Sequence, residues 1–261
     1  MKKIRKAMVV YYTRYYAAFL KVEKALRKVG IKYSKAKREN EIAIRRLIEK
    51  ADAVIVVGGD GTLLRASHFI EKKPVLHVSS ARNAHEAFFS RATGKDSEKK
   101  LRLLMLGKYK LLPLMRLEAW LNGKRLPYKA LNEVFAGGRK AYHTVRYELA
   151  VGKKKEEQKS SGVIISTPAG SNAWGKSAGG IKLKLTDRKI AYVAREPYYG
   201  RLTKPRLTKG VADGNSRIVV KSKMRQGGIV VIDSYKKEFN FNNGDALVVK
   251  AAKQPLNLIS F

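Results

Sequence analysis

The sequence predicts an N-terminal open parallel α/β domain at residues 1–108 and a C-terminal, mainly antiparallel β-sandwich domain at residues 109–261. Three observations support this fold class. Strand-like and helix-like segments alternate as far as residue 108, and from there most segments alternate apolar and polar residues with period two. The chain of 261 residues is also long enough for two modest cores. We expect the last ~20 residues to pack back onto the N-terminal domain.

The first half follows a βαβαβ order, which is typical of a parallel sheet. Residues 53–57, AVIVV, are apolar and β-branched, which indicates a strand buried on both faces. Gly30 is a plausible end for the first helix. The expected strands are 6–12, 31–34, 53–57 and 74–78, and the expected helices are 15–29, 41–51, a segment from Thr62, and 98–108.

The second half is predicted to be rich in strands. Residues 145–151 alternate between one apolar and one polar face, and short apolar runs recur afterwards between Gly, Asn and Asp. The strands expected there are 145–151, 217–222, 228–233, 238–243 and 246–251. Residues 182–186, KLKLT, also alternate as a strand does.

The composition excludes several classes of protein. The chain has no cysteine, which removes disulfides, thiolate nucleophiles and cysteine-based metal sites, and its four histidines are scattered. No apolar stretch approaches the roughly 20 residues that span a bilayer, and the N-terminus lacks a signal-peptide core. We therefore expect a cytoplasmic protein with no membrane partner.

The formal net charge of +35 implies strong attraction to anions. Lysine and arginine are spread through most segments and form no detachable basic tail. We therefore expect most of this charge to lie on a solvated surface and predict no specific nucleic-acid site.

The strand at 53–57 opens into Gly58-Gly59-Asp60-Gly61-Thr62 and then a helix-like segment. Ligands of open α/β sheets bind at such carboxyl ends, and glycines let backbone N–H groups approach a phosphate. Asp60 is the unusual residue, because a carboxylate beside phosphates is repelled unless it takes a proton from a hydroxyl or helps hold a metal. A simple tight turn is the alternative.

Two further stretches combine polar groups with apolar surroundings. In LNEVF, residues 131–135, Asn132 and Glu133 offer hydrogen bonds to a base edge and ribose hydroxyls, although a surface dipeptide fits equally well. In residues 160–180 a strand leads into a loop in which Trp174 offers a wall for a planar ring. The hydrogen-bonding side chains of that loop are Ser166, Thr167, Ser171, Asn172 and Ser177.

Residues 170–177, GSNAWGKS, also satisfy the P-loop pattern, and residues 228–233 resemble its companion strand. A P-loop begins a helix of several turns within a βαβ unit. Here Gly179 and Gly180 follow at once and the neighbourhood is predicted to be antiparallel, which disfavours a P-loop.

GGDGT, LNEVF and TPAGSNAW in this order resemble the motifs of the NAD kinase family, and the resemblance covers nearly the whole chain. EEQKSSG at 156–162, VVYYTRY at 9–15 and AREP at 194–197 look most similar to the mitochondrial-type branch. The resemblance implies a homodimer or homotetramer that transfers the γ-phosphoryl group of ATP, with Mg²⁺, to the adenosine-ribose 2′-hydroxyl of NAD.

In this resemblance Asp60 matches the family's proposed base, and no residue is assigned as a metal ligand. The residues that match the family's nucleotide contacts are Gly58, Gly59, Gly61, Thr62, Asn132, Glu133, Ser161, Thr167, Ser171, Asn172, Ala173, Trp174 and Ser177.

The chain departs from the family pattern in three places. HVSSARNAHEAFF, residues 77–89, stands where many members have a glycine-rich stretch; Ser161 stands where the main branch has an aspartate; and Ala169 replaces a threonine. NADH as acceptor and polyphosphate as donor therefore stay open. Two rival classes also remain: a lipid kinase shares the GGDGT loop but needs an apolar groove, and a nucleic-acid-binding module explains the charge but not Asp60.

Overall fold

The computed structural model describes residues 1–79, 87–140, 142–233 and 237–261. The chain forms two compact units. The first contains Met1–Pro113 and Leu256–Phe261, and the second contains Leu114–Pro255. The sequence-based boundary at residue 108 lies a few residues before this division, and the segment that returns to the first unit is Leu256–Phe261, shorter than the expected ~20 residues.

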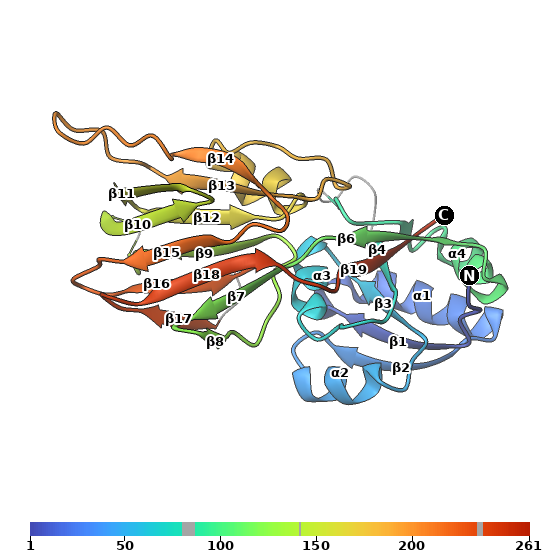
Figure 1. Ribbon diagram of the computed structural model, residues 1–261. Coiled ribbons are helices and arrows are strands. Elements are labelled where there is room, and N and C mark those ends of the chain that lie inside the picture. Colours follow the sequence, from blue (N-terminus) through green and yellow to red (C-terminus); the bar gives the residue numbers. More distant parts are fainter. Residues whose placement is uncertain (80–86, 141, 234–236) are drawn as a thin grey trace. The chain divides into compact units, whose positions relative to one another are not determined.

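The first unit is built on a mixed, mostly parallel sheet with the strand order β2-β1-β3-β4-β19-β6, in which β5 pairs with β4 (Figure 1). Its strands are β1 Lys6–Tyr11, β2 Lys32–Lys37, β3 Ala53–Val57, β4 Val75–Ser79, β5 Ala92–Thr93, β6 Lys110–Leu114 and β19 Leu256–Ser260. Its helices are η1 Thr13–Tyr15, α1 Tyr16–Val29, α2 Glu41–Ile48, α3 Asp60–Ser67 and α4 Ser97–Leu106.

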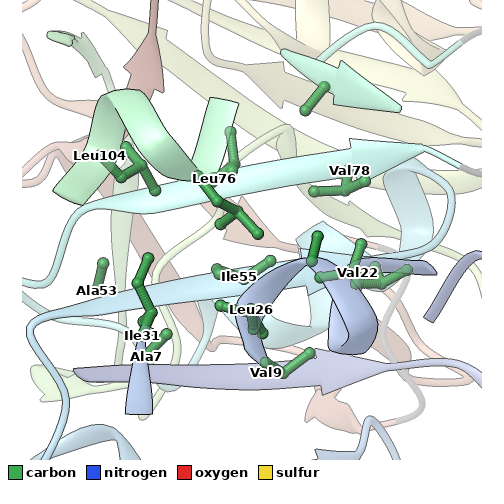
Figure 2. Packing of buried hydrophobic residues seen from close by; sticks show 14 of the residues in the cluster. Ala7, Val9, Val22, Leu26, Ile31, Ala53, Ile55, Leu76, Val78 and Leu104 are labelled. Atoms are coloured by element: carbon green, nitrogen blue, oxygen red, sulfur yellow. The ribbon is translucent and has the colours of Figure 1, made fainter. Parts of the chain in front are cut away.

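The central strands β1, β3 and β4 are buried on both faces, as their apolar sequences require. Alternate residues such as Val9, Ile55 and Leu76 pack against α1 and α4 (Figure 2), and the intervening residues Val54 and Val56 are fully buried on the opposite face. The predicted parallel α/β sheet is therefore confirmed.

The helix ends follow local chemistry. Gly30 ends α1 in the left-handed conformation that glycine adopts without strain. Asn40 is the N-cap of α2, because its side chain accepts a hydrogen bond from the Ala43 N–H. The third helix begins at Asp60, earlier than the predicted Thr62, so the carboxylate lies in the first turn.

The second unit contains two six-stranded sheets whose pairings are antiparallel, which confirms the predicted class. One has the order β11-β10-β15-β18-β7-β8 and the other the order β14-β13-β12-β9-β16-β17 (Figure 1). The strands are β7 Leu117–Leu121, β8 Lys124–Arg125, β9 Glu133–Gly137, β10 Val145–Val151, β11 Lys154–Ser160, β12 Gly162–Ser166, β13 Lys189–Arg195, β14 Lys209–Asp213, β15 Ile218–Ser222, β16 Gly228–Ile232, β17 Glu238–Phe241 and β18 Ala246–Ala251. The only helical turns in the described part of this unit are η2 Gly170–Asn172 and α5 Trp174–Ser177.

One expectation in the second unit was wrong. Residues 182–186 form no strand, although KLKLT alternates in the sequence. The segment connects α5 to β13, and Leu183 hydrogen-bonds side chains of the η2 turn instead of a neighbouring strand. No helix among the described residues is long and apolar enough to cross a membrane.

Candidate functional site

The glycine loop lies at the carboxyl end of β3, between the carboxyl ends of β1 and β4. Gly59 is the extended residue before α3, so the first free N–H groups of the helix face the loop. A Cβ atom on Gly58 would lie 2.5 Å from Thr62 Oγ1. The loop therefore needs glycine there, and the buried Thr62 fixes its shape.

The Asp60 carboxylate is held in place and still reachable. Its Oδ2 accepts a hydrogen bond from the Phe88 N–H at 2.9 Å, and its Oδ1 accepts one from the Phe89 N–H at 3.2 Å. The side chain keeps 23% of its surface exposed. An anchored carboxylate with free surface, next to a phosphate-type loop, has the geometry that a proton acceptor needs.

His77 supports this loop from within the sheet, a role that the sequence did not predict. It is fully buried, and its Nε2 lies 3.0 Å from the carbonyl oxygen of Gly58. Because a carbonyl only accepts, Nε2 carries the proton and Nδ1, 3.7 Å from Asp60 Oδ1, is bare in the neutral ring. Burial lowers the pKa of His77, although the negative charge of Asp60 acts in the other direction and raises it. The one available signal was a polar residue inside the apolar strand 74–78.

A second group of polar atoms gathers in the second unit. Asn132 Oδ1, Glu133 Oε2 and Ser166 Oγ are buried and have no hydrogen-bond partner among the residues that the structure describes. Glu133 and Ser166 are paired opposite each other in β9 and β12, so their side chains share one face of the sheet, and Asn132 directly precedes Glu133. Buried polar atoms without partners are rare in folded proteins and indicate a missing ligand or water.

Asp233 organises that place, and the sequence did not predict its role. Its carboxylate accepts hydrogen bonds from the backbone N–H groups of Leu131, Asn132 and Glu133 at 2.7, 2.7 and 3.1 Å. Burial, together with the nearby negative charge of Asp233, raises the pKa of Glu133 to about 8. Glu133 is therefore largely protonated at neutral pH in the absence of a ligand.

The hydroxyl-rich loop turns most of its polar groups inward. Thr167 Oγ1 donates to the Leu131 carbonyl, Ser171 Oγ to the Pro168 carbonyl, and Asn172 Nδ2 to the carbonyls of Pro168 and Leu183. A Cβ atom on Gly170 would lie 2.0 Å from the backbone carbonyl oxygen of Asn132. These contacts hold the loop tightly against the Asn132-Glu133 segment.

The remaining predicted residues of this unit fall into two places. Ala173 and Trp174 follow the η2 turn, and the Trp174 ring lies 5.1 Å from that of Phe135. Ser177 is exposed, and its Oγ contacts only the Ala173 carbonyl. Ser161 precedes β12 and bonds Glu196, whereas Thr167 follows β12, so the two are separated by roughly 20 Å of extended chain. The structure thus places the other predicted contact residues of the second unit near one another and leaves Ser161 apart.

The structure lacks the context of a P-loop at residues 170–177. The helix that follows, α5, has four residues, and the preceding strand β12 is antiparallel to both of its neighbours. Lys176 is exposed on this short turn.

Of residues 77–89, which stand where many members of the family have a glycine-rich stretch, those at 80–86 lie outside the described residues. Among the residues that the structure describes, no group of three or more His, Asp or Glu side chains could hold a metal ion.

Comparison with known proteins identifies two matching family models. The ATP-NAD kinase N-terminal domain matches residues 5–109, and the ATP-NAD kinase C-terminal domain matches residues 131–261. A probable NADH kinase of Oryza sativa is 32% identical over 81% of this chain and 72% of its own length. The NAD kinase of Thermoplasma volcanium is 29% identical over 81% of this chain and 74% of its own.

Two solved structures share the fold. The NAD kinase of Archaeoglobus fulgidus in complex with ATP superposes with a TM-score of 0.78 at 21% identity, over 98% of this chain and 93% of that one. A yeast NADH kinase complexed with NADH gives a TM-score of 0.82 at 15% identity, over 100% of this chain and 84% of that one.

Proposed function

This chain belongs to the ATP-NAD kinase family and phosphorylates NAD to NADP with ATP, and from that premise we propose how its residues divide the work. The observation that carries the assignment of roles is the anchored, partly exposed carboxylate of Asp60 beside a glycine loop. No other carboxylate lies within the loop at 58–62.

The donor is assigned to the first unit. Gly58, Gly59, Gly61 and Thr62 form the phosphate loop, in which the free N–H groups at the start of α3 and its positive end favour the phosphates. Mg²⁺ would be carried by the ATP phosphates, where it would neutralise part of their charge. Inorganic polyphosphate would present the same phosphate chemistry to this loop.

The acceptor is assigned to the second unit. The unpartnered atoms of Asn132 and Glu133 accept hydrogen bonds from the amine of a base or from ribose hydroxyls. Trp174 lines the dinucleotide site, and Thr167, Ser171, Asn172 and Ala173 hold its loop in shape. Ser177 lies on α5 next to Ala173, at the exposed edge of this group. Ser161 lies outside the group, so a contact from it requires an extended dinucleotide or a second copy of the chain.

Asp60 takes the proton from the ribose 2′-hydroxyl as that oxygen attacks the γ-phosphorus. The new O–P bond forms while the bond from the γ-phosphorus to its bridging oxygen breaks, and ADP leaves with that electron pair. The phosphoryl transfer itself needs mainly positioning and charge stabilisation. A positioned base contributes about 10²- to 10⁴-fold.

Several finer assignments rest on the sequence. They are a two-domain arrangement with a boundary near residue 108, a homodimer or homotetramer, a cytoplasmic location and membership of the mitochondrial-type branch. NADH is a candidate acceptor beside NAD, because relatives named as NADH kinases occur in rice and yeast.

The test is incubation with ATP, Mg²⁺ and NAD, with NADP detected by an NADP-specific dehydrogenase; parallel reactions with NADH and polyphosphate define the substrates. Asp60→Asn should lower kcat by at least about 10²-fold and leave the KM for ATP nearly unchanged. A fall of less than about tenfold would refute the role of Asp60 as base, and rescue by excess Mg²⁺ would make it a metal-site residue instead.

A further inference from the structure

Three neighbouring strands of the first unit deliver residues to the same edge of the sheet. The order β2-β1-β3 places Arg38 after β2, Tyr12 after β1 and the loop at 58–62 after β3 (Figure 1). Backbone hydrogen bonds continue past the strands, from the Arg38 N–H to the Tyr11 carbonyl at 2.8 Å and from the Tyr12 N–H to the Val57 carbonyl at 3.3 Å. The positions of Tyr12 and Arg38 beside the loop are therefore fixed by the sheet.

The Arg38 side chain is held in one orientation. Its guanidinium carbon lies 3.3 Å from the centre of the Tyr12 ring, and its Nε donates to Glu39 at 2.7 Å. Its Nη1 lies 3.5 Å from Thr62 Oγ1, at the glycine loop. Within the described chain Nη2 has no hydrogen-bond partner. An arginine stacked on an aromatic ring loses little further freedom when its free N–H groups bind a ligand.

Its carboxylate partner does not use the edge of the guanidinium that faces the loop. Glu39 binds Nε, and the side chains of Arg38 and Glu39 are 23% and 46% exposed, so the ion pair is partly open to solvent. The stacking on Tyr12 fixes the plane of the guanidinium, and Glu39 leaves its Nη groups uncovered. Planar guanidinium groups match the oxygens of a phosphate, and Nη1 and Nη2 are the groups left for them.

We propose that Arg38 binds the phosphate chain of the phosphoryl donor at the loop 58–62, and that Tyr12 is the residue that positions it. This inference rests on the proposed assignment of the donor to that loop. The ligand class is a polyphosphate chain, carried by ATP or by inorganic polyphosphate. Arg38 then adds a fixed positive charge beside the N–H groups at the start of α3.

The test compares Arg38→Met with a matched control, Arg45→Met. Arg45 also lies over an aromatic ring, 4.5 Å from the centre of Phe69, but it is on the exposed side of α2. Steady-state kinetics with MgATP and NAD should give a KM for ATP about 10- to 100-fold higher in Arg38→Met, with the KM for NAD changed less than about threefold. Arg45→Met should keep both values within about twofold.

Further variants keep the inference testable if Arg38→Met folds poorly. Arg38→Lys keeps a charge but loses the planar fork and should raise the KM for ATP by about 3- to 10-fold. Tyr12→Phe should behave as wild type, whereas Tyr12→Leu should raise the KM for ATP as Arg38→Lys does. With polyphosphate as donor the same order of variants should hold, and loss with ATP alone would move the contact from the phosphates to the nucleoside.

Equal changes in the KM values for ATP and NAD, or an Arg38→Met enzyme that resembles Arg45→Met, would overturn the role of Arg38. That outcome leaves the proposed function standing if Asp60→Asn is inactive. If Asp60→Asn is active, the proposed function fails first, whatever Arg38→Met shows.

Discussion

Replacing Glu133 with glutamine should change the stability of the free protein relative to wild type, in a direction that favours the variant increasingly as the pH rises. Glu133 is 3% exposed, its Oε2 has no partner in the described part of the chain, and its pKa is raised from 4.5 to about 8 by burial and by the negative charge of Asp233. At 1.36 kcal/mol per pKa unit, this rise corresponds to roughly 4.8 kcal/mol against the ionised form. Glutamine has the same shape and no charge to bury.

The pH window follows from the two pKa values. Between pH 4.5 and about 8 the folded protein holds a proton on Glu133 that the unfolded chain has lost. The stability present below pH 4.5 therefore falls as the pH rises, by about 2.5 kcal/mol from pH 5 to 7 and about 1.3 kcal/mol more by pH 8.5. The variant lacks this loss, so the difference in free energy of unfolding between variant and wild type should shift toward the variant by these amounts. An amide left partly unpaired subtracts about 1–3 kcal/mol at every pH and does not alter this shift.

Urea unfolding at pH 5, 7 and 8.5 measures this difference. Both tryptophans, Trp120 and Trp174, belong to the second unit, so tryptophan fluorescence reports the unit that contains Glu133. Glu238→Gln, at a side chain 53% exposed in the same sheet, is the matched control and should show no such shift. A difference that stays constant or shifts toward wild type from pH 5 to 8.5 would refute the burial of an unpaired carboxyl at this position.

Two further outcomes are expected. Lys176→Ala should retain at least about half of the wild-type kcat, because Lys176 is exposed on a four-residue helix and contacts no phosphate in our assignment. If this variant is folded but inactive while Asp60→Asn is active, residues 170–177 act as a P-loop and the assignment is wrong. Binding to DNA or RNA should be weak, without sequence preference, and lost by a few hundred millimolar salt, because the net charge of +35 is spread along the chain. Electrophoretic mobility shifts across a salt series measure this binding. A sequence-preferring complex that survives such salt would contradict the prediction.

The sequence alone was sufficient where the deciding interactions are local. The loop at 58–62 was predicted because an apolar strand, a run of glycines and a helix are neighbours in the chain. The absence of a P-loop was predicted in the same way, since Gly179 and Gly180 prevent a long helix after residue 177. The parallel and antiparallel halves were likewise visible, because burial on one face or on two faces dictates the hydrophobic period.

Only the tertiary structure decided which groups stay available for a ligand. His77 lies under the loop, and Asp233 holds the segment of Asn132 and Glu133, through pairings between residues far apart in the chain. The hydroxyl of Thr167 was expected to face a ligand, but it donates to the Leu131 carbonyl. A residue type states only what a side chain can bond. Strand order and register determine which partner reaches it first, and these depend on contacts across the whole sheet.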